Sequence, residues 1–200
     1  LRKNGSMDMT EGVIWKQLLG FAVPLMLGFV FQQLYNTVDS VVVGNFVGKE
    51  ALAAVGSTGN IINTLIGFFT GLSTGATVVI ARMFGARDRE GVHNAVHTTM
   101  VMTLVLALVF TVIGVLMTPQ MLKWMNTPTD VLPQAEEYLR IYFSGIIGLM
   151  IYNMGAGILR AVGDSRRPLY FLIAACLTNI VLDVVFVLYL HMGVAGAALA

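Results

Sequence analysis

The chain has 200 residues, of which 56% are hydrophobic and 12% are charged, and its formal net charge is +1. An average soluble domain has about 25% charged residues, so this composition excludes an ordinary soluble domain. The basic residues are dispersed among short connections, which gives no reason to expect a nucleic-acid partner.

Apolar stretches long enough to cross a bilayer recur along the whole sequence. A helix needs about 20 residues to cross the hydrocarbon, and five stretches reach that length while a sixth begins near the end. The predicted spans are 14–40, 51–80, 92–117, 134–159, 168–190 and a truncated span at 194–200. The connections are short except at 118–133, where two Thr-Pro pairs predict an ordered turn region. The expected fold class is all-α, a polytopic transmembrane helix bundle.

Most basic residues fall on one side of the predicted membrane. Nine share the side of the N-terminus and three lie on the other side. The nine are Arg2, Lys3, Lys16, Arg82, Arg87, Arg89, Arg160, Arg166 and Arg167, and the three are Lys49, Lys123 and Arg140. Because cytoplasmic loops carry an excess of Lys and Arg, we expect a cytoplasmic N-terminus, with residues 1–13 as a cytoplasmic segment.

Two acids stand inside otherwise uncharged, membrane-length stretches. Residues 17–38 carry no charge before Asp39, and residues 168–182 carry none before Asp183. A carboxylate in hydrocarbon is costly, so such acids face a bundle interior or a watery cavity and mark ion or substrate pathways. At 1.5 Å per residue, both acids fall in the outer half of the bilayer. Asp39 could instead be a helix cap among the headgroups.

Polar residues share a helix face with each acid. Gln32 and Tyr35 precede Asp39 by seven and four residues, and Asn179 precedes Asp183 by four. Carboxylate and amide oxygens suit a hard cation, so Asp39, Asn179 and Asp183 are the predicted ligands of Na⁺ if sodium is the coupling ion. The same carboxyls could instead carry a proton. A polar cluster that merely holds helices together is the alternative.

The fourth span has a face that resembles a cavity wall. Tyr138 and Asn153 are about 60° apart around the helix axis, and Tyr142 and Gly145 lie between them. This face combines aromatic, polar and small side chains, so Tyr138 and Asn153 join Gln32 and Tyr35 as predicted substrate-binding residues. Tyr138 could also be an ordinary aromatic residue of the membrane interface.

Pro24 and a row of glycines are the remaining backbone features. Pro24 removes one backbone hydrogen bond from the first span, four turns before Asp39, and is a candidate hinge. Gly67, Gly71 and Gly75 repeat every four residues, a spacing that predicts close approach of another helix.

Several short motifs occur together at consistent spacing. They are Pro24-Leu25, the stretch QQLYNTVD at 32–39, Gly44, ALAA at 51–54, ARMFGA at 81–86, LRAVGD at 159–164, NIVLD at 179–183 and GVAGAA at 193–198. Together they resemble the multidrug and toxic compound extrusion (MATE) family of cation-coupled transporters. The resemblance covers roughly nine-tenths of the chain, and it depends on the set of motifs rather than on any one of them.

The resemblance implies a twelve-helix protein made of two six-helix lobes around a central cleft. Residues 14–200 would be the N-terminal lobe, and we expect the chain to be a piece of a longer protein that supplies the rest of the sixth helix and the second lobe. In the family this lobe holds the cation or proton site, which by position would be Asp39, Asn179 and Asp183. Gln32, Tyr35, Tyr138 and Asn153 match positions that line the cavity in some members, whereas a further cavity asparagine is Ala156 here.

The expected function is cation-coupled antiport, with Na⁺ or H⁺ entering as amphipathic, often cationic organic compounds leave. No other cofactor is expected, and the absence of a nucleophile–base set in the sequence argues against an enzyme. The expected location is the plasma membrane of a bacterium or archaeon, with the lipid bilayer as a partner. The alternatives are an exporter or flippase of a lipid-linked or polysaccharide intermediate and a non-transporting membrane assembly subunit.

Overall fold

The computed structural model describes residues 14–200, so the predicted cytoplasmic segment at 1–13 lies outside the described residues. The elements are α1 (Ile14–Val42), the π-helix η1 (Val43–Val47), α2 (Lys49–Gly85), α3 (Arg89–Trp124), α4 (Leu132–Ala161), α5 (Arg166–Asp183), the π-helix η2 (Val184–Tyr189) and α6 (Gly193–Leu199). Within 14–200 there is no strand, and five helices are long and apolar enough to cross a membrane. The predicted all-α transmembrane bundle is therefore confirmed.

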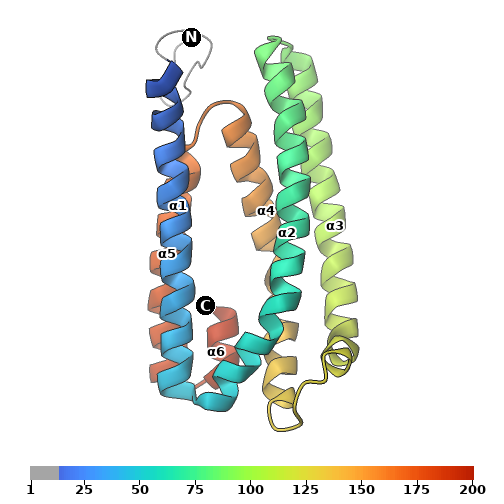
Figure 1. Cartoon of the computed structure of the whole chain (residues 1–200). Helices are drawn as coiled ribbons and strands as arrows, with labels where there is room; N and C mark the ends of the chain where they lie inside the picture. The colour runs from blue at the N-terminus through green and yellow to red at the C-terminus, as the bar shows by residue number, and fades with distance from the viewer. Residues whose placement is uncertain (1–13) are drawn as a thin grey trace.

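The helices form two groups joined through α4 and α6. Helix α1 packs along α5, while α2 and α3 both pack against α4, and the short α6 packs on α4 and η2 (Figure 1). The start of α1, the α2–α3 turn and the α4–α5 connection lie at one end of the bundle (Figure 1). This end carries most of the described basic residues, namely Lys16, Arg82, Arg87, Arg89, Arg160, Arg166 and Arg167. The topology thus gathers the residues on which the predicted orientation depends.

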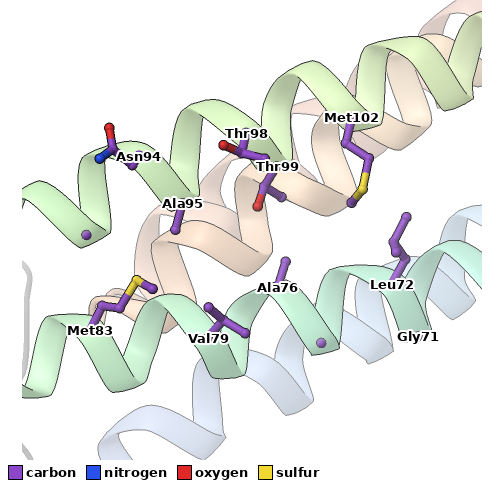
Figure 2. A pocket seen from close by; sticks show the side chains of 12 residues that line it. Gly71, Leu72, Ala76, Val79, Met83, Asn94, Ala95, Thr98, Thr99 and Met102 are labelled. Carbon is purple, nitrogen blue, oxygen red and sulfur yellow. The ribbon is translucent and has the colours of Figure 1, made fainter.

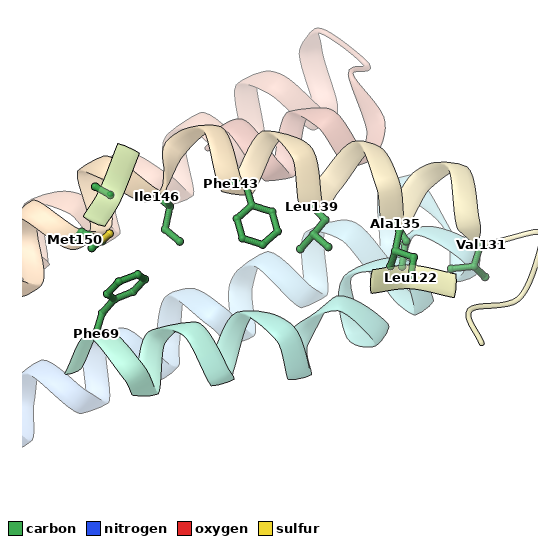
Figure 3. Packing of buried hydrophobic residues seen from close by; sticks show 10 residues of the cluster. Phe69, Leu122, Val131, Ala135, Leu139, Phe143, Ile146 and Met150 are labelled. Atoms are coloured by element: carbon green, nitrogen blue, oxygen red, sulfur yellow. The ribbon is translucent and has the colours of Figure 1, made fainter. Parts of the chain in front are cut away.

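The larger apolar core lies between α2, α3 and α4. Phe69 of α2, Leu122 of α3 and a row of buried α4 side chains meet there (Figure 3). The α4 row is Ala135, Leu139, Phe143, Ile146 and Met150, spaced three or four residues apart as one helix face requires. In a membrane protein such contacts stabilise the fold by close packing, because lipid is as apolar as the side chains.

Helix α3 is longer than the sequence predicts. The expected turn region at 118–133 is wrong in its first part, because α3 continues through Pro119 to Trp124. Proline removes an amide donor from the helix, and the Thr118 hydroxyl donates to the Gly114 carbonyl one turn earlier, at 2.7 Å. A Cβ on Gly114 would overlap the Phe143 ring, so α3 and α4 are in close contact at this level. That packing supports the helix across the proline.

The glycine row of α2 does not form the predicted helix contact. Gly67, Gly71 and Gly75 are exposed, and a Cβ on any of them would meet nothing within 4 Å. The close approach of α2 and α4 is at Gly157 instead, where a Cβ would collide with the Ser73 hydroxyl. Among residues 14–200 the glycine spacing therefore did not identify the helix contact, because a period of four residues gives a face of α2 without saying what that face contacts.

Two helices end in π-helical winding at the opposite end of the bundle. Residues 43–47 follow α1 and residues 184–189 follow α5, and these two segments contact each other. In each, an amide donates to a carbonyl five residues earlier, from Gly48 to Val43 and from Leu190 to Val185. The first helix therefore continues past the predicted end at residue 40, and the connection is at Gly48, whose φ of 125° suits glycine.

Candidate functional site

The packing of α1 on α5 sets the relative height of the two acids. The Cys176 thiol donates to the Phe31 carbonyl at 3.8 Å, and a Cβ on Gly28 would contact Leu172 at 3.5 Å. The offsets are 145 residues (176 minus 31) and 144 residues (172 minus 28). Because both helices run in the same direction with the same rise, this register places Asp183 opposite residues 38 and 39. The structure therefore brings Asp39 and Asp183 together.

Burial and electrostatics agree with this register. Asp183 is fully buried and Asp39 is half-buried, and the two carboxyls interact as like charges. Both oxygens of Asp183, Oδ1 of Asp39 and Oδ1 of Asn179 are buried without a hydrogen-bond partner among the described residues. Asn179 is one turn before Asp183 on α5. Four acceptor oxygens from three side chains are thus left without a donor.

Such oxygens fit either form of the predicted site. Buried polar atoms are normally paired, so a group of unpaired acceptors is a place where a cation, a proton or an ordered water would bind. The possible ligands are two carboxylates and one amide oxygen, which are the oxygen ligands that a hard cation prefers. No cluster of three or more His, Cys, Asp or Glu side chains occurs within the described part of the chain, so the set does not suit a transition metal. Na⁺ and H⁺ both remain compatible with these residues.

Tyr138 is the residue of α4 that faces the acids. It is 8% exposed and belongs to an apolar cluster with Val42, Val43 and Val187, which flank the two acids in sequence. Its phenol interacts electrostatically with both Asp39 and Asp183. Because the side chain is inside the bundle, it is not simply an aromatic residue of the membrane interface.

The predicted substrate-binding residues divide into two groups. Tyr35 is joined to Gln32 by a side-chain hydrogen bond and interacts with Tyr138. Asn153 instead lies where α4 contacts α2. Its side-chain amide donates to the Leu149 backbone carbonyl, and its backbone carbonyl accepts from the Ser73 hydroxyl of α2. The structure therefore groups Gln32, Tyr35 and Tyr138 near the acids and leaves Asn153 with α2.

Two features of the site go beyond the residues predicted for it. Tyr142 is one turn after Tyr138 and interacts with Tyr35, so its spacing of four residues was a usable signal. The π-helical winding after each acid had no such signal, because it depends on packing between segments far apart in sequence. Pro24 lies within α1, which continues through it, so a hinge there remains a prediction.

Comparison with known proteins agrees with this architecture. The MatE family model matches residues 24–185. A Bacillus subtilis protein described as probable multidrug resistance protein YpnP is 35% identical over 96% of this chain and 43% of its own length. A Thermotoga maritima protein described as probable multidrug resistance protein NorM is 28% identical over 94% of this chain and 41% of its own length.

A solved structure shows the same fold. A MOP superfamily transporter from Pyrococcus furiosus superposes with a TM-score of 0.86 at 33% identity, over 92% of this chain and 40% of its own. The chain thus spans well under half the length of the relatives that it matches. The family model covers most of the sequence, and the fold agrees with that of the solved transporter. The chain is an integral membrane protein that belongs to the MATE family of transporters.

Proposed function

We propose that these residues form the N-terminal lobe of a cation-coupled antiporter that exports amphipathic, often cationic organic compounds. The observation that carries the proposal is the pair of acids, Asp39 on α1 and Asp183 on α5, with buried oxygens that lack donors. A Na⁺ ion would be ligated by these oxygens, whereas a proton would be carried by one of the two carboxyls. Asn179 would add a neutral ligand, and no further cofactor is proposed.

The aromatic residues beside the acids support a permissive substrate site. Tyr35, Tyr138 and Tyr142 lie near one another, and Tyr138 also lies near both carboxyls. Flat rings offer apolar contact area, and nearby acids attract a positive group. The relatives described as multidrug resistance proteins are consistent with such a substrate class. Gln32 and Asn153 remain part of the proposed substrate surface.

Antiport follows if the cation and the substrate favour different states of the lobe. Each ligand can shift alternating access only by its difference in affinity between the two states. Pro24 lies in α1, between the basic end and Asp39, and is the proposed hinge. A MATE protein 33% identical to this chain has been solved in a straight and in a bent conformation, which supports a lobe that changes shape.

Export of an anionic lipid-linked or polysaccharide intermediate is the second candidate function. An anionic group would require buried basic partners. Among residues 14–200, Asp183 is buried and Asp39 half-buried without an ion-pair partner, whereas Arg140, at a similar distance into α4, is exposed and paired with Glu136 at 2.7 Å. Charge therefore favours a cationic substrate.

The proposed location is the plasma membrane of a bacterium or archaeon, with the N-terminus in the cytoplasm. The basic residues that share one end of the bundle support this orientation. The second lobe of the same protein and the surrounding bilayer are the proposed partners.

Gradient-driven transport by the full-length protein in liposomes tests the proposal. A Na⁺ gradient at constant pH and a pH gradient without Na⁺ are imposed separately, and the movement of a cationic dye is followed. We expect one gradient to drive dye movement and Asp183→Asn to abolish it. Asp130→Asn is the matched control, because Asp130 is exposed in the α3–α4 connection. If neither gradient moves dye, or if Asp183→Asn transports normally, the antiporter reading is wrong.

A further inference from the structure

A groove runs between α2 and α3, away from the acids. It has a volume of about 680 Å³, and Figure 2 shows side chains from both helices along it. Its α2 side is made by Gly71, Leu72, Gly75, Ala76, Val79 and Met83. Its α3 side is made by Gly91, Asn94, Ala95, Thr98, Thr99 and Met102. The three polar side chains, Asn94, Thr98 and Thr99, all come from the N-terminal part of α3.

The groove has the dimensions of one lipid chain in one leaflet. From Gly71 to Met83 the helix rises about 18 Å, close to half of the roughly 30 Å hydrocarbon thickness. Its glycines and alanines leave space where larger side chains would project, and Val79 is 49% exposed. The groove is therefore open along the helix surface and is lined mainly by apolar atoms.

The basic end of the groove carries an excess of positive charge. Arg82 shares the face of α2 with Gly75 and Val79, and Arg87 and Arg89 lie in and just after the α2–α3 turn. None of these three arginines has an ion-pair partner among residues 14–200. Two acids lie in the same region. One of them, Asp88, caps α3 by accepting a hydrogen bond from the Gly91 amide at 2.8 Å. Glu90 is the other acid.

We propose that this groove binds an anionic phospholipid of the inner leaflet, with an acyl chain between α2 and α3 and the phosphate beside Arg82. The inner-leaflet assignment rests on the orientation proposed above. Basic side chains near the cytoplasmic surface attract anionic headgroups, and Asn94 and Thr98 supply polar partners below the phosphate. The groove is thus a lipid site separate from the cation site at the other end of the bundle.

Lipid binding to the purified full-length protein tests the proposal. The protein is stripped of lipid in detergent, phosphatidylglycerol or phosphatidylcholine is added, and bound lipid is counted by native mass spectrometry. We expect one saturable phosphatidylglycerol site and weaker phosphatidylcholine binding. Gly75→Leu places an apolar side chain in the groove, and its Cβ would meet nothing within 4 Å. This variant should lose the saturable site.

Matched variants separate the groove from a general effect on the protein. Gly67→Leu is the control for Gly75→Leu, since Gly67 is on the same exposed helix but outside the groove lining. Arg82→Gln should weaken phosphatidylglycerol binding about fivefold and reduce its advantage over phosphatidylcholine. Lys123→Gln, at the other end of α3, should have no effect. Glu90→Gln should strengthen binding.

Three results would overturn the lipid site. The first is that Gly75→Leu still binds phosphatidylglycerol, and the second is that the native protein binds the two lipids equally. The third is that neither the native protein nor any variant has a saturable lipid site, as expected if the second lobe covers the groove. Thermal unfolding establishes that each variant is folded. Gly71→Leu fills the same groove if Gly75→Leu does not accumulate. If the protein does not bind lipid in this groove, gradient-driven dye transport can still occur, so the two proposals are tested independently.

Discussion

Replacing Asp183 by asparagine should stabilise the protein in the absence of the coupling cation. Asp183 is fully buried, its two oxygens have no donor within the described chain, and the Asp39 carboxyl interacts with it as a like charge. Asparagine has nearly the same shape and carries no charge. The substitution therefore removes a repulsion without opening a cavity, whereas most substitutions of a buried residue destabilise.

The register of α1 and α5 allows an estimate of the size of this effect. Packed helix axes are 8–10 Å apart, so two acids at the same height beside the helix contact hold their charges roughly 6 Å apart. At an effective dielectric constant of 20, two such charges repel by about 3 kcal/mol. A bound cation would offset this repulsion, and at 100 times its dissociation constant it would stabilise the protein by about 2.7 kcal/mol.

Thermal unfolding in detergent measures both effects. In choline buffer at a pH where the acids are ionised, Asp183→Asn should unfold at a higher temperature than the native protein. Adding Na⁺, or lowering the pH, should raise the unfolding temperature of the native protein, because either cation neutralises the pair, and should barely affect the variant. A response to Na⁺ at constant pH identifies Na⁺ as an ion that this site binds. A variant less stable than the native protein in choline, or a native protein that responds to neither cation, would refute the reasoning.

Three further substitutions test other parts of the structure. Gly114→Leu should destabilise the protein by about 1–3 kcal/mol or more, because the new side chain overlaps Phe143; thermal unfolding measures this, and unchanged stability would mean that α3 and α4 are farther apart. Ser73→Ala should cost about 1 kcal/mol by removing the hydrogen bond to the Asn153 carbonyl, without affecting dye binding. Pro24→Ala should leave stability equal or higher while slowing gradient-driven efflux, and undiminished efflux would remove the hinge.

The fold could be predicted largely from hydrophobic length, because a bilayer fixes how long an apolar helix must be. Helix ends were less predictable. Pro119 and Thr118 suggest a turn in isolation, yet the contact of Gly114 with Phe143 keeps α3 helical beyond them. Such a contact joins residues that are far apart in sequence, and no local pattern reveals it.

The two acids of the site could be predicted from the sequence, whereas the residues around them could be predicted less well. A carboxylate inside an apolar stretch is costly unless it has a role, so Asp39 and Asp183 stand out in the sequence. Asn153 was grouped with the other cavity residues because it shares a helix face with Tyr138. The structure shows that the α4 helix also contacts α2 along that face, where the Asn153 carbonyl accepts from Ser73. Helical periodicity assigns a face, whereas only the packing assigns its neighbour.

The end of the bundle that holds the acids is also where the backbone is least regular. Helices α1 and α5 change to π-helical winding within a turn after Asp39 and directly after Asp183, and the two π-helical segments contact each other. π-helical turns are rare and occur often at functional sites, because only tertiary packing keeps them from relaxing to α-helix. Here that packing comes from Val43 and Val187, which meet in the apolar cluster around Tyr138. A cation that binds between the carboxyls would therefore act on the part of the lobe whose conformation depends most on its neighbours. The core between α2, α3 and α4 is made of apolar side chains and offers that cation no ligand.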